Sequence, residues 1–74
     1  MKAVRYYVVY ELWKDGDVVG KATSEMLMKR KIRERKDIED MEEAIKRDKG
    51  VPEGVDAVIV NYIIMDDEVE VEVE

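Results

Sequence analysis

The chain has 74 residues, a length that suits one small domain with a modest core. It contains no Cys and no His, which excludes disulfides, thiolate metal sites, thiol nucleophiles and imidazole acid–base catalysis. Charged residues make up 43% of the chain and give a net charge of −6, which disfavours general nucleic-acid binding because phosphates repel an acidic protein.

Uncharged polar side chains are scarce, since the Ser, Thr, Asn and Gln residues together are Thr23, Ser24 and Asn61. Two origins favour such a composition: a hyperthermophilic source, and a designed sequence built from strong helix and strand formers. No apolar run approaches the length of a membrane span, and no signal peptide is visible at Met1. We therefore expect a soluble, cytoplasmic protein.

Residues 2–29 predict a β-hairpin, because two runs rich in β-branched and aromatic residues flank the Gly-containing turn Lys14-Asp15-Gly16. A two-residue loop would place Trp13 opposite Val18. A three-residue loop would place Leu12 opposite Val18 and Arg5 opposite Glu25.

The three-residue loop is our prediction, because it leaves one face of the hairpin, from Val4 to Met28, without any charge. The uncharged face would then hold Val4, Tyr6, Val8, Tyr10, Leu12, Val18, Gly20, Ala22, Ser24, Met26 and Met28. Its small residues Gly20, Ala22 and Ser24 would let a helix approach closely.

Residues 29–36 form a basic connector, and residues 35–49 predict a helix. Ile38, Met41, Ala44 and Ile45 share one helix face, and Gly50 provides a stop. Glu42 with Lys46, and Glu43 with Arg47, have the spacing of favourable ion pairs along a helix.

Residues 55–65 predict a third strand that is apolar on both sides, which indicates that both faces are partly covered. Residues 66–74 alternate Val with Glu, so this acidic segment could form a fourth strand, continue the third strand or fray. Pairing between the basic connector and the acidic segment, within one chain or between two, is a further alternative.

These elements predict a single α+β domain of ββαβ(β) topology. The antiparallel sheet has three or four strands in the order 2-1-3, and the helix packs on one of its faces.

The segment from Ile32 onward resembles small uncharacterised proteins of phages and prophages. The likeness rests on Asp37-Ile38-Glu39, on a short helix that ends in Lys49-Gly50, and on residues 58–62, Val-Ile-Val-Asn-Tyr. Those proteins have a similar hairpin–helix–strand layout. The resemblance offers no catalytic residue to carry over, and it implies at most a host-interaction or counter-defence role, for a natural or an engineered version.

Residue types that act as nucleophiles, acid–base groups or metal ligands in other proteins are missing from this chain or have no suitable partner. Ser24 and Thr23 have no activating partner, and Asp66-Asp67-Glu68 is more typical of a solvated turn than of a metal site. We therefore predict no enzyme activity, no catalytic residue, no metal and no cofactor. Nucleic acid is not the expected partner either. If it bound, the contacts would come from Lys29, Arg30, Lys31, Arg33, Arg35 and Lys36.

The sheet face opposite the helix is the best candidate for a protein interface, since Tyr and Trp are frequent interface anchors. The candidate residues are Tyr7, Val9, Trp13, Val19 and Leu27. We predict a non-enzymatic protein-interaction module, with a foreign protein or a second copy as partner. The alternatives are a designed or hyperthermophilic scaffold without a ligand, and weak nucleic-acid binding through the basic connector.

Overall fold

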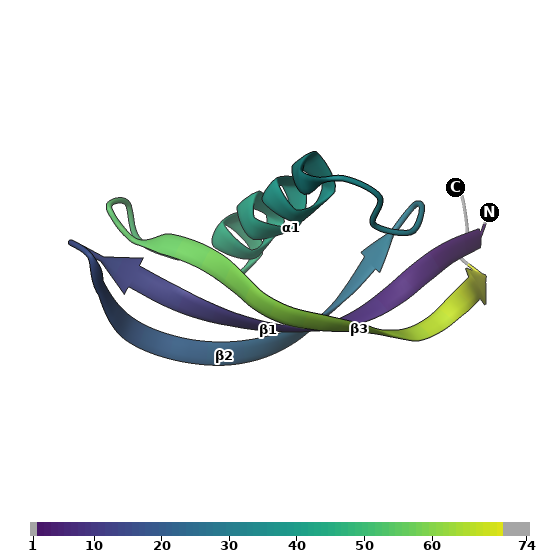
Figure 1. Cartoon of the computed structure of the whole chain (residues 1–74), viewed down its shortest axis with the longest axis horizontal. Coiled ribbons are helices and arrows are strands. Elements are labelled where there is room, and N and C mark those ends of the chain that lie inside the picture. The colour runs from purple at the N-terminus through teal and green to yellow at the C-terminus, as the bar shows by residue number, and fades with distance from the viewer. Residues whose placement is uncertain (1, 71–74) are drawn as a thin grey trace.

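The computed structural model describes residues 2–70 and shows an antiparallel sheet with a helix on one face (Figure 1). The elements are β1 (Lys2–Lys14), β2 (Asp17–Met28), α1 (Arg35–Asp48) and β3 (Asp56–Glu70). β1 pairs antiparallel with both other strands, so the order is β2-β1-β3. The predicted α+β fold and strand order are confirmed. In these residues no helix is long and apolar enough to cross a membrane.

The hairpin turn consists of two residues rather than three. Asp15 and Gly16 both have positive φ, 52° and 82°, as a type I′ turn requires. Trp13 pairs with Val18, but Leu12 pairs with Gly20, so Val19 is the extra residue of a β-bulge.

The predicted three-residue loop is therefore wrong. Arg5 pairs with Leu27, and Glu25 pairs with Tyr7. The bulge shifts the register by one residue in the direction opposite to that of the predicted loop, so the observed partners differ from the predicted ones by two residues. Because the side chains of a strand alternate between faces with a period of two, most residues keep the face that was predicted for them. Val18 is the exception, because it pairs with Trp13 and is 47% exposed.

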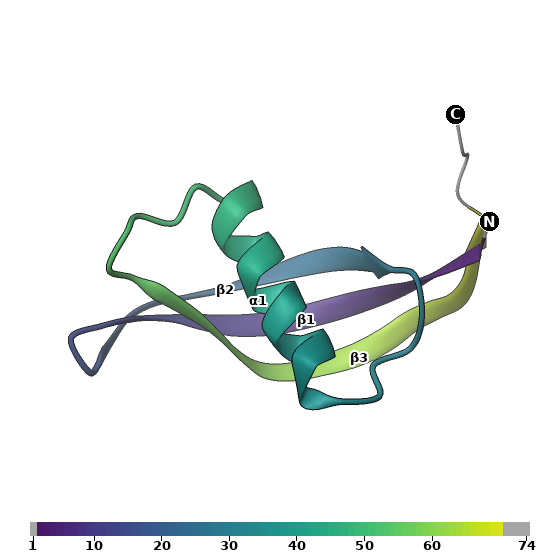
Figure 2. The same cartoon turned by 90° about the horizontal axis from the view of Figure 1, so that it is seen from above.

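The core lies between α1 and the concave side of the bent sheet (Figure 1). Met41 and Ile45 of α1 are 0% and 1% exposed, and they lie against alternate residues of β1. Seen from above, α1 crosses the strands diagonally (Figure 2). The buried residues that form the core are Val4, Tyr6, Val8, Tyr10, Met41, Ile45 and Ala57.

Gly20 does not serve as a point of close helix approach. A Cβ built at this position meets the side chain of Leu12 first, at 3.5 Å. The predicted role for this glycine is therefore wrong.

Tyr6 connects the core to the segment that leads into α1. Its ring lies edge-on to the ring of Tyr62, with 5.7 Å between the ring centroids. Its hydroxyl oxygen accepts a hydrogen bond of 2.8 Å from the backbone N–H of Ile32. This bond satisfies the polar end of an otherwise buried side chain.

Asp37 organises the start of α1. Its carboxylate accepts hydrogen bonds from the backbone N–H groups of Arg33 and Glu34, at 3.0 and 3.2 Å, and pairs with Arg30 Nη2 at 2.7 Å. The Arg33 N–H is the largest cause of a lowered pKa for Asp37. The Glu34 N–H and the charges of Arg30 and Arg33 act in the same direction, while burial opposes them.

β3 extends further than predicted, because Asp66–Glu70 continue the strand and pair with the beginning of β1. Of the alternatives for the acidic segment, the described part therefore continues the third strand, and residues 71–74 lie outside the described range. Both faces of this strand were expected to be partly covered, and over residues 60–65 about half of each apolar side chain is exposed. Ile63 is 56% exposed, and Val60, Ile64 and Met65 are nearly as exposed, because a single helix cannot cover the whole sheet.

Candidate protein interface

The sheet face that points away from α1, here called the open face, mixes apolar and charged side chains. The pairing places Tyr7 between Glu25 of β2 and Ile63 of β3, and Arg5 between Leu27 and Asp66. Its members are Arg5, Tyr7, Val9, Glu11 and Trp13 of β1, Lys21, Thr23, Glu25 and Leu27 of β2, and Val58, Asn61, Ile63 and Asp66 of β3.

The five residues predicted for the interface all lie on this face or at its hairpin end. Leu27 and Val19 are 53% and 58% exposed. Tyr7 is also exposed, whereas Val9 and Trp13 are half-buried. The indole Nε1 of Trp13 donates a hydrogen bond of 3.3 Å to Glu11 Oε1, which fixes the ring against β1.

Sequence reasoning missed the contribution of β3. Ile63 lies directly opposite Tyr7, and Val58 lies opposite Glu11, so both extend the apolar area of the open face. Tyr62 and Ile64 pair with Val8 and Tyr6, and are therefore on the helix side of the sheet. The sequence signal for this contribution was the continuous apolar run in residues 55–65, which we interpreted as a strand partly covered on both faces.

The outer edge of β3 is partly occupied by side chains of the same chain. Glu42 Oε2 of α1 accepts a hydrogen bond of 2.9 Å from the backbone N–H of Ile59. Asn61 Oδ1 accepts from the N–H of Tyr62 at 2.9 Å, and Asp66 Oδ1 accepts from the N–H of Glu68 at 3.0 Å. These three amides are therefore already engaged, which reduces the capacity of this edge to pair with another strand.

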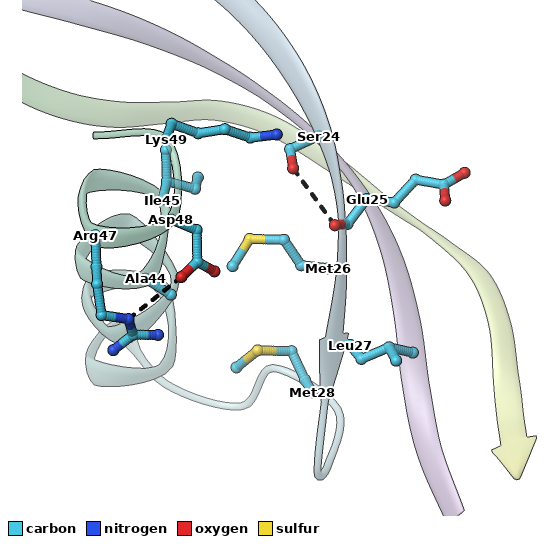
Figure 3. Close-up of a pocket in the computed structure, with 10 residues that line it drawn as sticks. All are labelled: Ser24, Glu25, Met26, Leu27, Met28, Ala44, Ile45, Arg47, Asp48 and Lys49. Atoms are coloured by element: carbon cyan, nitrogen blue, oxygen red, sulfur yellow. Dashed lines mark hydrogen bonds and ion pairs between the residues drawn. The ribbon is translucent and has the colours of Figure 1, made fainter. Parts of the chain in front are cut away.

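A groove of about 320 Å³ separates β2 from the C-terminal half of α1 (Figure 3). Met26 and Met28 point across it toward the helix, whereas Glu25 and Leu27 point the opposite way. Ala44 and Ile45 form the helix side of the groove, with charged residues of the last helical turn at its rim.

The basic connector is largely neutralised by acidic side chains. Arg30 pairs with Asp37 and Glu34, and Lys31 pairs with Asp67 of β3 at 3.7 Å. The other ion pairs of the predicted nucleic-acid residues are Arg35–Glu39 and Lys36–Asp40. Four of the six predicted cations thus have an acidic partner close by, and the connector meets the acidic end of β3 within one chain.

The acidic residues do not converge on a common point. Asp67 pairs with Lys31 and Glu68 pairs with Lys2, each at 3.7 Å. Within residues 2–70 no group of three or more metal-ligating side chains is arranged to hold a metal ion. The hydroxyl of Ser24 donates to the backbone carbonyl of Glu25 at 3.4 Å.

Comparison of the chain with protein-family models, with curated proteins and with solved structures gave no match.

Proposed function

We propose that this chain is a non-enzymatic protein-interaction module that binds another protein through its open face. The observation that supports this most directly is the exposed pair of Tyr7 and Ile63, which lie opposite each other at the centre of the face. Leu27 on one side and Val58 on the other continue the apolar area across all three strands. An apolar area rimmed by charges is typical of an interaction surface.

The charges around this apolar area favour a protein over a nucleic acid as the partner. Arg5 and Asp66 are opposite each other, as are Glu11 and Lys21, so both signs frame the face. A phosphate backbone would meet carboxylates as often as cations. The resemblance to phage proteins further suggests a bacterial protein as the partner, in a host-interaction or counter-defence role.

The test is affinity capture from a bacterial extract with three versions of the chain. Ile63→Lys places a charge in the middle of the open face. Glu43→Gln changes the net charge by the same amount on the exposed surface of α1 and serves as the matched control. A partner held by the wild type and by Glu43→Gln, but lost with Ile63→Lys, supports the proposal. Equal capture by all three versions contradicts it, and no specific capture is what a scaffold without a ligand predicts.

A further inference from the structure

The outer edges of the sheet differ in how they are protected. Three amides of β3 donate to side chains, and β3 carries five carboxylates and no basic residue, so two copies of it repel each other. In the part of the chain that the structure describes, no side chain accepts a hydrogen bond from an amide of β2. The edge that is free to accept another strand is therefore β2.

Two opposite charges of β2 lie on the open face. They are Lys21 and Glu25, which pair with Glu11 and Tyr7 of β1, and Thr23 lies midway between them. Within residues 2–70 neither Lys21 nor Glu25 forms an ion pair with another side chain. Both charges are therefore available to a strand added at this edge.

A second copy of β2, aligned antiparallel, places opposite charges face to face in one register. Every second residue of an edge strand points its backbone N–H and C=O groups outward. In a symmetric antiparallel pair these outward-pointing residues must face each other, so the twofold axis passes through one residue and not between two. Centring on Thr23 places Lys21 opposite Glu25 of the second copy, twice by symmetry. It also brings the bulge residue Val19 near Leu27 of the second copy, and these are the two most exposed apolar residues of β2.

The neighbouring registers lose this complementarity. Centring on Lys21 or on Glu25 places like charges directly opposite each other. Centring on Ala22 places Val19 against Glu25, and centring on Ser24 places Lys21 against Leu27. Only the Thr23 register matches opposite charges and apolar pairs at the same time.

The helix side of β2 is also compatible with this pairing. In the same register Gly20 lies opposite Met26 of the second copy, and Ala22 lies opposite Ser24, so each long side chain meets a small residue. Met26 borders the groove between β2 and α1 (Figure 3), which leaves room for the flexible thioether to adjust.

We propose that a second copy of this chain docks on the edge of β2. The two β2 strands pair antiparallel about Thr23 and form a six-stranded sheet in the order β3-β1-β2-β2-β1-β3. This inference goes beyond the proposed function, because it concerns the strand edge and not the open face. The dimer would place two open faces side by side and so double the area offered to another protein.

Charge reversal at two positions tests the register. Lys21→Glu alone and Glu25→Lys alone each replace both cross-strand ion pairs by like-charge pairs, and each should weaken the dimer about tenfold or more. The double variant restores two opposite-charge pairs and should dimerise like the wild type. A mixture of the two single variants should form a heterodimer, because each variant then faces its opposite.

The measurement is light scattering coupled to size exclusion over a range of concentrations, with circular dichroism to confirm that each variant is folded. A wild-type dimer, weakened single variants and recovery in the double variant and in the mixture are the expected results. A wild type that stays monomeric at every concentration overturns the proposal. So does a dimer that the single reversals do not weaken.

The Ile63→Lys variant separates this inference from the proposed function. Its altered side chain lies on β3, away from the β2 edge, so the dimer should persist while binding of a foreign protein is lost. If Ile63→Lys dissociates the dimer, the copies meet through the open face and the β2 edge pairing is wrong.

Discussion

Glu42 provides a direct test of how α1 protects the edge of β3. Its Oε2 accepts the N–H of Ile59 at 2.9 Å, so Glu42→Ala leaves that partly buried amide without its acceptor. We expect a loss of about 1–2 kcal/mol in the free energy of unfolding, the range for removing a charged acceptor from a partly buried donor. Urea unfolding followed by circular dichroism and by the fluorescence of Trp13, the single tryptophan, measures this loss.

Two further variants isolate the hydrogen bond from other effects. Glu42→Gln keeps an oxygen that can accept the Ile59 N–H, so its loss of stability should be less than half of the loss caused by Glu42→Ala. Glu43→Ala makes the same change to helix propensity at an exposed position and should have little effect. Amide exchange of Ile59 should be slow in the wild type and faster in Glu42→Ala. Equal losses for Glu42→Ala and Glu42→Gln, or unchanged exchange at Ile59, would refute the reasoning.

Ile45→Ala should reduce the free energy of unfolding by about 2–4 kcal/mol, because it opens a cavity at a fully buried site, whereas Arg47→Ala should change it by less than about 0.5 kcal/mol. Urea unfolding distinguishes the two, and similar values for both would mean that α1 is not packed on the sheet. Gly20→Ala should raise the same free energy by about 0.5 kcal/mol, because the new methyl group meets Leu12 at an ordinary contact distance; a loss of stability would show that the strand needs glycine there. Because the pKa of Asp37 is lowered in the folded state, its ionised carboxylate stabilises the fold. This stabilisation is complete at pH values above the ordinary pKa of 3.8, and it is lost as the pH falls through the lowered pKa. Urea midpoints measured across that range should fall less steeply toward acid pH in Asp37→Asn than in the wild type, and parallel curves would contradict this.

Sequence patterns predicted the faces of the hairpin better than its register. Alternation assigned Tyr6 and Val8 to the core and Tyr7 to the opposite face, and the structure agrees on all three. The register depended on where one extra residue sits, either in the loop or as a bulge at Val19. Both solutions sort the side chains from Gly20 onward in the same way, so the charge pattern there could not distinguish them.

Long-range partners were the second kind of feature that the sequence concealed. Glu42 and Lys46 have the spacing of a helical ion pair, yet in the structure each reaches β3 instead. Glu42 accepts the N–H of Ile59, and Lys46 Nζ lies 3.6 Å from Asp56 Oδ1. A local pattern describes what is possible within one helix, and it contains no information on which strand will lie beside that helix.

The scarcity of uncharged polar residues explains why carboxylates take so many structural roles in this chain. Helix starts and strand edges need oxygen acceptors for free amides, and Ser, Thr and Asn usually provide them. Here Asp37 accepts two amides ahead of α1, Glu42 accepts one from β3, and Asp66 accepts another near the end of that strand. The lowered pKa of Asp37 links the helix start to the ionised carboxylate, so acid should loosen the start of α1. The β3 edge is therefore protected by carboxylate acceptors of the same chain, whereas the β2 edge, for which we propose pairing with a second copy, has no such acceptor among the described residues.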